Sequence, residues 1–376
     1  MAKHAALSAS SSHRWMNCPP SVRLTEHIAD SGSIYAAEGS EAHALCEYKL
    51  RRLLGMDAGN PLDCPGGLQY YDSTMEDAAN GYVAFVMELL EEIRKTCSDP
   101  IVMVEQRLNF SRWVKDGFGT GDAVIVADGI LQIVDFKYGT GVPVSAEDNS
   151  QMRLYALGAL DMFGELYDVD TVKMTIYQPR LSNISTDSVS KDDLLDWAES
   201  TLRPVAELAY KGEGEMNAGS WCRFCKLRTT CRKRAEANLA LAQHDFKLPP
   251  TLSDEEIAII LDQLDDLTSW AADIREYALT AALSGTHFDG WKLVEGRANR
   301  RYTNEEAVAQ AVIGSGHDPY ERKLLGITAM EKLLGKKQFA TLLADLVERP
   351  QGKPTLVPAS DKRPEMTNAK NDFANE

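Results

Sequence analysis

Residues 121–137 read GDAVIVADGILQIVDFK, and this stretch decides the fold. Two short apolar segments, rich in β-branched residues, flank Asp128-Gly129, the residue pair that a type I′ turn favours. The stretch therefore predicts a two-residue β-hairpin. In such a hairpin the residue numbers of every facing pair have the same sum as those of Asp128 and Gly129. The numbers of Asp122 and Asp135 also have this sum. We expect these two carboxylates to face each other, with side chains roughly 5 Å apart.

Two facing carboxylates repel each other, so a hairpin that carries them calls for a compensating charge. A divalent cation between Asp122 and Asp135 removes the repulsion, and oxygen ligands suit Mg²⁺ or Mn²⁺. Lys137 follows two residues after Asp135 and so shares its face of the strand. Two acids and an ammonium group around such a metal favour hydrolysis of phosphodiesters. In the alternative interpretation, the acids merely end their strands and Lys137 is solvated.

Composition limits the class of protein. The chain has 376 residues, enough for two or three domains, with 44% hydrophobic and 26% charged residues. It contains no apolar run of membrane-spanning length and no signal-peptide core, which predicts a cytoplasmic protein without membrane contact. A net charge of −16 argues against a nonspecific polyanion binder, although residues 221–234 carry six basic side chains and no acid.

The order of the predicted elements indicates an α/β fold. Helices are expected at 36–54, 72–95, 147–163 and 190–210, the last kinked or broken at Pro204, and strands at 101–108 and 171–178 in addition to the hairpin. A domain of residues 1–245 is therefore expected to contain a mixed central sheet flanked by helices.

A helical C-terminal region is predicted for 251–347, after a boundary at 245–250. Ser253 with Glu256, and Thr303 with Glu306, form capping boxes that open helices. The first of these helices runs to about residue 284, and its apolar positions favour a core stripe over a contact with a partner helix. A last amphipathic stretch covers 330–347, and the polar tail 348–376 is predicted to be mobile. The apolar positions of the first helix are Ile257, Ile260, Leu261, Leu264, Leu267, Ile274 and Leu279.

Four short motifs occur in the order found in one enzyme family. They are Gly39-Ser40-x-x-His43, Gly121-Asp122, Asp135-Phe136-Lys137 and Gln151-x-x-x-Tyr155. The set resembles RecB-type nucleases of the PD-(D/E)xK superfamily, which have a restriction-endonuclease-like core. Gly121 stands where that signature has proline.

The resemblance implies a role for each matching residue. Asp122, Asp135 and His43 would bind the divalent metal, together with the backbone carbonyl of Phe136. Lys137 would assist the attacking water. Gln151 and Tyr155 would contact substrate or hold the site together. Taken alone, His43 also fits a half-buried helix histidine, and Glu105 on the preceding strand is only a weak candidate.

Cys222-x2-Cys225-x5-Cys231 is the second chemical signal, because three cysteines this close in a reducing compartment indicate a metal site. Cys18, beside two prolines, is the best fourth ligand. The pattern resembles the [4Fe–4S] staple of AddB-type nucleases, which ties the two ends of the nuclease domain together. Thiolate chemistry also allows structural Zn²⁺. Cys46, Cys64 and Cys97 lack such spacing.

The resemblance implies a metal-dependent deoxyribonuclease, an exonuclease rather than an endonuclease, that acts on single strands or duplex ends. The chain also looks like proteins carried by bacteriophages and prophages, which suggests phage DNA replication, recombination or processing in the bacterial cytoplasm, with a separate helicase or recombination protein as a partner. Two alternatives are a DNA-binding or scaffold protein that does not cut, and a zinc-stapled interaction protein. The basic residues among the cysteines form either a DNA-facing rim or a solvated face.

Overall fold

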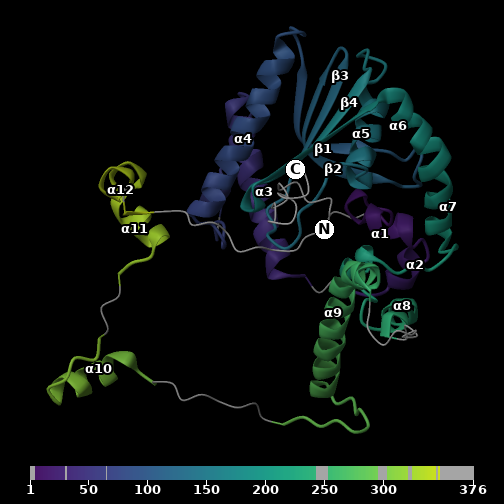
Figure 1. Cartoon of the computed structure of the whole chain (residues 1–376). Helices are drawn as coiled ribbons and strands as arrows, with labels where there is room; N and C mark the ends of the chain where they lie inside the picture. The colour runs from purple at the N-terminus through teal and green to yellow at the C-terminus, as the bar shows by residue number, and fades with distance from the viewer. Residues whose placement is uncertain are drawn as a thin grey trace, which may run out of the picture. The chain divides into compact units, whose positions relative to one another are not determined.

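The computed structural model describes residues 5–29, 32–64, 66–242, 253–294, 303–320, 324–343 and 346–347. The chain divides into two compact units, Met1–Ala281 and Ala282–Glu376. The first unit contains a five-stranded sheet with helices on both faces (Figure 1). Within the described residues, no helix is long and apolar enough to cross a membrane.

The sheet has the order β1-β2-β3-β4-β5. Its strands are β1 (Ile101–Asn109), β2 (Phe118–Ala127), β3 (Ile130–Phe136), β4 (Thr171–Gln178) and β5 (Asn183–Ser190). All neighbours are antiparallel except β3 and β4, which are parallel because α5 (Ser150–Phe163) crosses over between them. The mixed α/β sheet expected from the sequence is therefore present, and the polar edge strand β5 is an addition.

The β2–β3 hairpin has the predicted register. Ala123 pairs with Val134 and Ala127 with Ile130, as the constant sum requires. The predicted type I′ turn is wrong, because only Gly129 of the two turn residues has a positive φ, of 82°. The backbone carbonyl of Gly129 accepts a hydrogen bond from the Thr171 amide at 3.1 Å, so the start of β4 holds this turn.

Helices cover each face of the sheet with a separate apolar core. On one face, α3 (Ile34–Leu53) and α4 (Ser73–Arg94) pack against alternate residues of β2 such as Ala123 and Ile125. On the other face, α5 packs against the intervening residues Val124 and Val126. This alternation is the expected result of a strand whose side chains point to opposite faces in turn.

The remaining helices of the first unit are short, apart from α9. They are α1 (Ser12–Asn17), α2 (Ser21–Thr25), α6 (Lys191–Trp197), α7 (Arg203–Lys211), α8 (Arg232–Ala242) and α9 (Asp254–Leu283), with 3-10 turns at Ala9–Ser11, Pro61–Asp63, Pro179–Leu181 and Ser220–Phe224. A π-helical turn at Ala198–Leu202 joins α6 to α7 just before Pro204, so the helical backbone is locally distorted there but not broken. The expected boundary at 245–250 lies outside the described residues.

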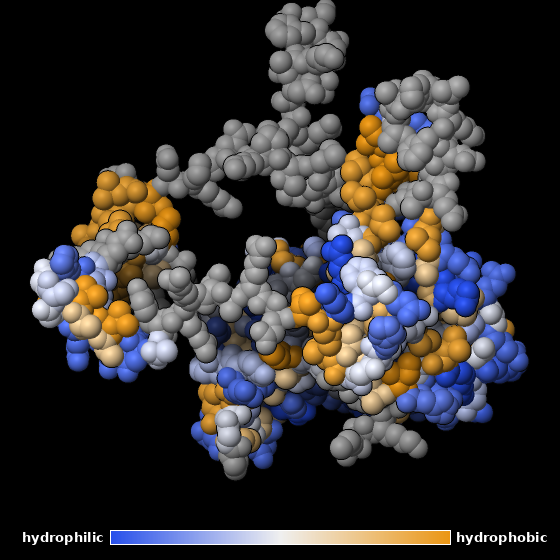
Figure 2. Space-filling view, turned by 90° about the horizontal axis from the view of Figure 1, so that it is seen from below, coloured by the Kyte–Doolittle hydropathy of each residue, from blue (hydrophilic) through white to orange (hydrophobic). Residues whose placement is uncertain are grey.

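Helix α9 begins with the predicted capping box: the Ser253 amide donates to Glu256 Oε2 at 2.8 Å, and the Glu256 amide donates to Ser253 Oγ at 3.3 Å. The predicted core stripe is wrong, because α9 has no buried residue and its apolar side chains at 257, 261, 264 and 279 are exposed. Figure 2 shows such apolar surface, in orange, lying open among hydrophilic surface.

The second unit contains three described helices, α10 (Glu305–Gly314), α11 (Ile327–Leu334) and α12 (Lys336–Leu343). The side chain of Asn304, rather than Thr303, caps α10, because Asn304 Oδ1 accepts the Ala307 amide at 3.0 Å. Gly335 separates α11 from α12, so the amphipathic stretch forms two helices instead of one. The predicted mobile tail, residues 348–376, lies outside the described residues.

Candidate functional site

Strand β1 changes the direction of its side chains at Glu105. This residue has a φ of 50°, a left-handed conformation that is rare for glutamate. The pairs on either side, Val104 with Ala123 and Gln106 with Gly121, keep one register, and only the pair between them is missing from the ladder. Val104 packs with α3 and α4, whereas Leu108 packs with α5, so the alternation is reversed across Glu105. Local backbone strain of this kind is concentrated at functional sites.

Glu105 lies beside two of the residues that the sequence singled out. His43 Nδ1 is 3.2 Å from Asp122 Oδ1 and 3.9 Å from Glu105 Oε1. One ligand atom from each of the three residues lies within 4.8 Å of the others. They come from α3, β1 and β2, so three elements converge on one point. Imidazole and carboxylate donors at this spacing can hold a divalent metal ion.

The electrostatics of this group favour a bound cation. Burial and the charge of Asp122 raise the pKa of Glu105 to about 7. Burial lowers the pKa of His43, but the charge and hydrogen bond of Asp122 outweigh it and raise that pKa to about 9. In both cases the protein holds a proton where carboxylates crowd together. A divalent cation can replace these protons and neutralise the same charge.

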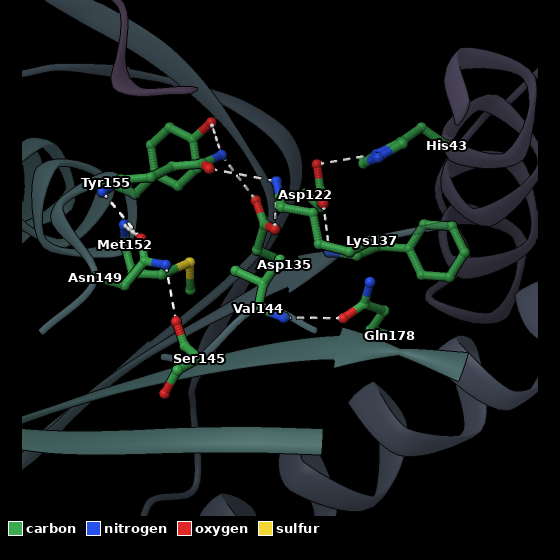
Figure 3. Close-up of polar contacts among 12 residues, drawn as sticks. His43, Asp122, Asp135, Lys137, Val144, Ser145, Asn149, Met152, Tyr155 and Gln178 are labelled. Carbon is green, nitrogen blue, oxygen red and sulfur yellow. Dashed lines mark hydrogen bonds and ion pairs between the residues drawn. The ribbon is translucent and has the colours of Figure 1, made fainter. Parts of the chain in front are cut away.

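A second group surrounds Asp135, on the α5 face of the sheet (Figure 3). Lys137 Nζ is 2.9 Å from Asp135 Oδ2 and donates to Gln151 Oε1 at 3.3 Å. Gln151 Nε2 donates to Asp135 Oδ1 at 3.2 Å and to the Tyr155 hydroxyl at 3.0 Å. The predicted acid, lysine, glutamine and tyrosine therefore form one connected network. Helix α5 supplies two of them, one turn apart.

Burial raises the pKa of Asp135, against the opposing charge of Lys137. The pKa of Lys137 is raised overall: burial favours its neutral form, but the negative charges of Asp135 and Asp122 outweigh that effect. Lys137 is therefore an ammonium ion that donates hydrogen bonds, not a neutral base. Tyr155 has a raised pKa because of burial and the charge of Asp135, so it stays a neutral phenol.

Asp122 connects the two groups. Its Oδ1 faces His43, and its Oδ2 accepts the backbone amide of Phe136 at 2.6 Å. Ladder pairing of β2 and β3 starts at Ala123 with Val134, so the predicted facing pair of Asp122 and Asp135 is not part of the ladder. Their carboxylates have different partners, His43 for one and Lys137 for the other. Metal ligation by the Phe136 carbonyl stays a prediction.

An open depression leads to His43 along one side of α3. Its lining includes Gly39, Ser40, His43, Glu47 and Glu105. A Cβ built on Gly39 meets no atom within 4 Å, so the helix surface is unobstructed there. The Gly39-Ser40-x-x-His43 motif thus lines the approach to the candidate metal ligands and carries one of them.

The four predicted cysteine ligands meet at one pocket far along the chain from the carboxylates. Cys18 follows α1, and the other three lie in tight turns between Ser220 and α8. All four line the same enclosed pocket, together with arginines 14, 228 and 234 and no acidic side chain. Cys46 and Cys97 are buried elsewhere, and Cys64 is exposed.

The spacing of the sulfur atoms bears on which metal suits this pocket. Four thiolates around a tetrahedral zinc lie about 3.8 Å apart, since each Zn–S bond is about 2.3 Å. Among the described residues, no three of the four cysteines bring their sulfur atoms within 4.8 Å of one another. As they stand, the four sulfur atoms do not have the spacing of a closed tetrahedral zinc site.

Two features of these sites had only weak signals in the sequence. The importance of Glu105 depends on its backbone conformation, and its only sequence signal was an acid on the strand before the hairpin. The arginines of the cysteine pocket were noted only as basic residues in 221–234, and Arg14 was not singled out. Its signal was a position one helical turn before Cys18, where its carbonyl accepts the Cys18 amide at 2.9 Å.

Comparison with solved structures gives a likeness to the protein described as "Crystal structure of SSO0001", at 15% sequence identity. It covers 59% of this chain and 96% of that one, with a TM-score of 0.23. A family model described as "Protein of unknown function (DUF2800)" matches residues 4–364, nearly the whole sequence. The chain therefore belongs to the DUF2800 family.

Proposed function

We propose that this protein is a metal-dependent nuclease with a PD-(D/E)xK core of the RecB type, which hydrolyses phosphodiester bonds of DNA. The observation that carries the proposal is the convergence of Asp122, Asp135 and Lys137 from two strands with His43 from α3 and Gln151 from α5. Asp122 pairs with His43, and Asp135 pairs with Lys137 and Gln151, while the amide of Phe136, the residue after Asp135, donates to Asp122. The mixed sheet and its α5 crossover are consistent with such a core.

The donor set fits Mg²⁺ or Mn²⁺. His43, Glu105 and Asp122 would hold the ion. Asp135 lies outside that group and pairs with Lys137, so its role as a ligand is expected on the resemblance alone. When bound, the ion supplies positive charge that polarises a phosphoryl oxygen and makes water easier to deprotonate. The raised pKa of Glu105, about 7, indicates a carboxylate whose ionisation such a charge would favour.

Lys137 positions water and offsets the negative charge that develops on the phosphate. Its ammonium group is fixed by Asp135 Oδ2 and Gln151 Oε1, at 2.9 and 3.3 Å. Gln151 is itself held, because its amide nitrogen donates to both Asp135 and Tyr155. A donor fixed before the reaction needs little reorganisation when charge develops.

We assign the four cysteines to a [4Fe–4S] cluster on the resemblance, and structural Zn²⁺ is the alternative that thiolate chemistry also allows. Cys18 and the group Cys222, Cys225 and Cys231 would hold it. The pocket joins the segment after α1 to the segment before α8, near the two ends of the domain. A centre bound here would supply a cross-link between them. We place the activity in phage-type DNA processing by an exonuclease, with a helicase or recombination protein as partner, on the resemblance alone.

The decisive experiment incubates anaerobically purified protein with end-labelled single-stranded DNA, duplex DNA and RNA, with Mg²⁺ or Mn²⁺. We expect degradation of DNA that stops with chelator and in Asp135→Asn. Asp192→Asn, an exposed acid in the first turn of α6, is the matched control and should retain activity. No cleavage of any substrate with either metal, by protein shown to be folded, would refute the proposal and leave a DNA-binding protein that does not cut.

A further inference from the structure

We propose that the arginines lining the cysteine pocket form a cationic shell for a doubly negative metal–tetrathiolate centre, and that Asp273 of α9 sets the charge of that shell. The inference rests on the proposed assignment of the four cysteines to a metal centre. It goes further by assigning roles to Arg14, Arg228, Arg234 and Asp273, which lie outside the sequence motifs.

The pocket is positively charged in spite of the acidic net charge of the chain. Its lining contains Arg14, Arg228 and Arg234 and no aspartate or glutamate. Arginine stays charged at any ordinary pH, so the pocket keeps these charges whether or not it is loaded.

Arg234 is the most informative of the three, because only 2% of its surface is exposed. A buried guanidinium group is costly unless an opposite charge and hydrogen bonds compensate it. Its Nη1 donates to the Arg228 carbonyl at 3.0 Å and lies 2.5 Å from Asp273 Oδ2. The other carboxylate oxygen of Asp273 is 3.1 Å from Arg228 Nε. One carboxylate on α9 is thus shared by two guanidinium groups.

The charges around the pocket do not cancel. Among the groups that line the pocket and the carboxylate paired with them, three arginines and one aspartate leave two positive charges, and Arg14 donates to the neutral Ser21 hydroxyl at 2.8 Å. Four thiolates with a centre of charge +2, either Zn²⁺ or an oxidised [4Fe–4S] core, carry two negative charges. The shell and the loaded centre therefore neutralise each other. A pocket built only to pack four neutral thiols has no need of this excess.

The same contact links the centre to α9. Asp273 lies in the second half of this helix, which has no buried residue of its own to fix it in place. The Arg228–Asp273–Arg234 ion pairs fasten α9 to the cysteine segment. Asp273 is therefore a positioning residue as well as the one negative charge of the shell.

The test compares zinc affinity, by competition with a chelator, and the reduction potential of iron-loaded protein. Arg228→Met removes a cation, so we expect an about 10–100-fold loss of zinc affinity and a lower reduction potential. Asp273→Asn removes the anion while keeping its shape, so both quantities should shift the other way. Arg223→Met, an exposed arginine in the same segment, is the control and should shift neither.

Shifts of opposite sign in Arg228→Met and Asp273→Asn would support the cationic shell. If these residues only held the fold together, both variants would weaken metal binding. Losses of the same sign would overturn the inference. If wild-type protein takes up neither zinc nor iron, the metal assignment fails, and this inference fails with it. No measurement here uses a nucleic acid, so the nuclease proposal is tested separately.

Discussion

The two candidate sites of this chain have opposite electrostatic designs. At the sheet, carboxylates crowd around one histidine, and His43 and Glu105 have raised pKa values because negative charge is in excess. At the cysteine pocket, arginines surround thiols and positive charge is in excess. The first environment attracts a bare cation, and the second accommodates a metal already enclosed in thiolates. A chain of net charge −16 thus keeps one local region of the opposite sign.

The variant with the largest expected effect disrupts the carboxylate site alone. Asp135→Asn removes the partner of Lys137 and leaves Gln151 without a charged acceptor, so cleavage should fall by at least about 10²–10³-fold. The measurement is the initial rate on labelled DNA with saturating Mn²⁺. Metal content at the cysteines should be unchanged, and a parallel loss of that metal would show that the two sites are not independent.

The reciprocal variant breaks the cysteine pocket. Cys18→Ser removes the ligand that comes from the other end of the domain, so most bound iron or zinc should be lost and the melting temperature should fall. Cys64→Ser, at an exposed cysteine outside the pocket, is the control. Metal analysis and thermal unfolding measure the effect. Full metal retention in Cys18→Ser would exclude Cys18 as the fourth ligand.

The pH dependence of metal binding sharpens the comparison. Glu105 binds a proton below about pH 7 and His43 below about pH 9, so a metal ion must displace these protons. Mn²⁺ affinity should therefore rise from pH 6 to pH 9, as calorimetric titration of the full chain would show.

Glu105→Gln should weaken Mn²⁺ binding by about 10–100-fold and remove the part of the pH dependence near 7. Glu38→Gln, on the same helix as His43, is a control outside the ligand group. Equal affinity and an unchanged pH profile in Glu105→Gln would mean that the ion binds without this carboxylate.

The variant with the smallest expected effect tests the hydrogen bonds of Gln151, which hold Lys137 and Asp135 in place. Tyr155→Phe removes the acceptor of one Gln151 hydrogen bond, worth about 1 kcal/mol, so the cleavage rate should fall roughly 2–10-fold. The change should appear in kcat rather than in Mn²⁺ affinity. An effect as large as that of Asp135→Asn would give Tyr155 a direct role in the chemistry.

Much of the sheet could be predicted because its strands carry strong local signals. The hairpin around Asp128-Gly129 and the alternation of residues 171–178 both correspond to strands in the structure. Strand β5 could not be predicted from its polar sequence NISTDSVS, because an edge strand with one solvated face lacks a hydrophobic pattern. The apolar stripe of α9 led to a wrong prediction. Periodicity shows that apolar residues share one face of a helix, but not whether another element packs against that face.

The site could be predicted in part for a similar reason. The hairpin register between Ala123–Val134 and Ala127–Ile130 was predicted from neighbouring residues, and Asp122, Asp135 and Lys137 lie just beyond its open end. The proximity of His43 to Asp122, and that of the four cysteines to one another, was expected only from the order of the motifs. Tertiary contacts bring these residues together. The orientation of Glu105 depends on one unusual backbone angle. No periodic pattern encodes such an angle.

That angle has a consequence for the evolution and engineering of the strand. A glutamate at φ 50° costs the native state of order 1–3 kcal/mol relative to an unstrained residue. Glycine at position 105 would relieve this cost, so Glu105→Gly should unfold at a higher temperature than Glu105→Ala. Stability alone would thus favour glycine at this position, whereas glutamate accepts backbone strain and brings a carboxylate beside His43.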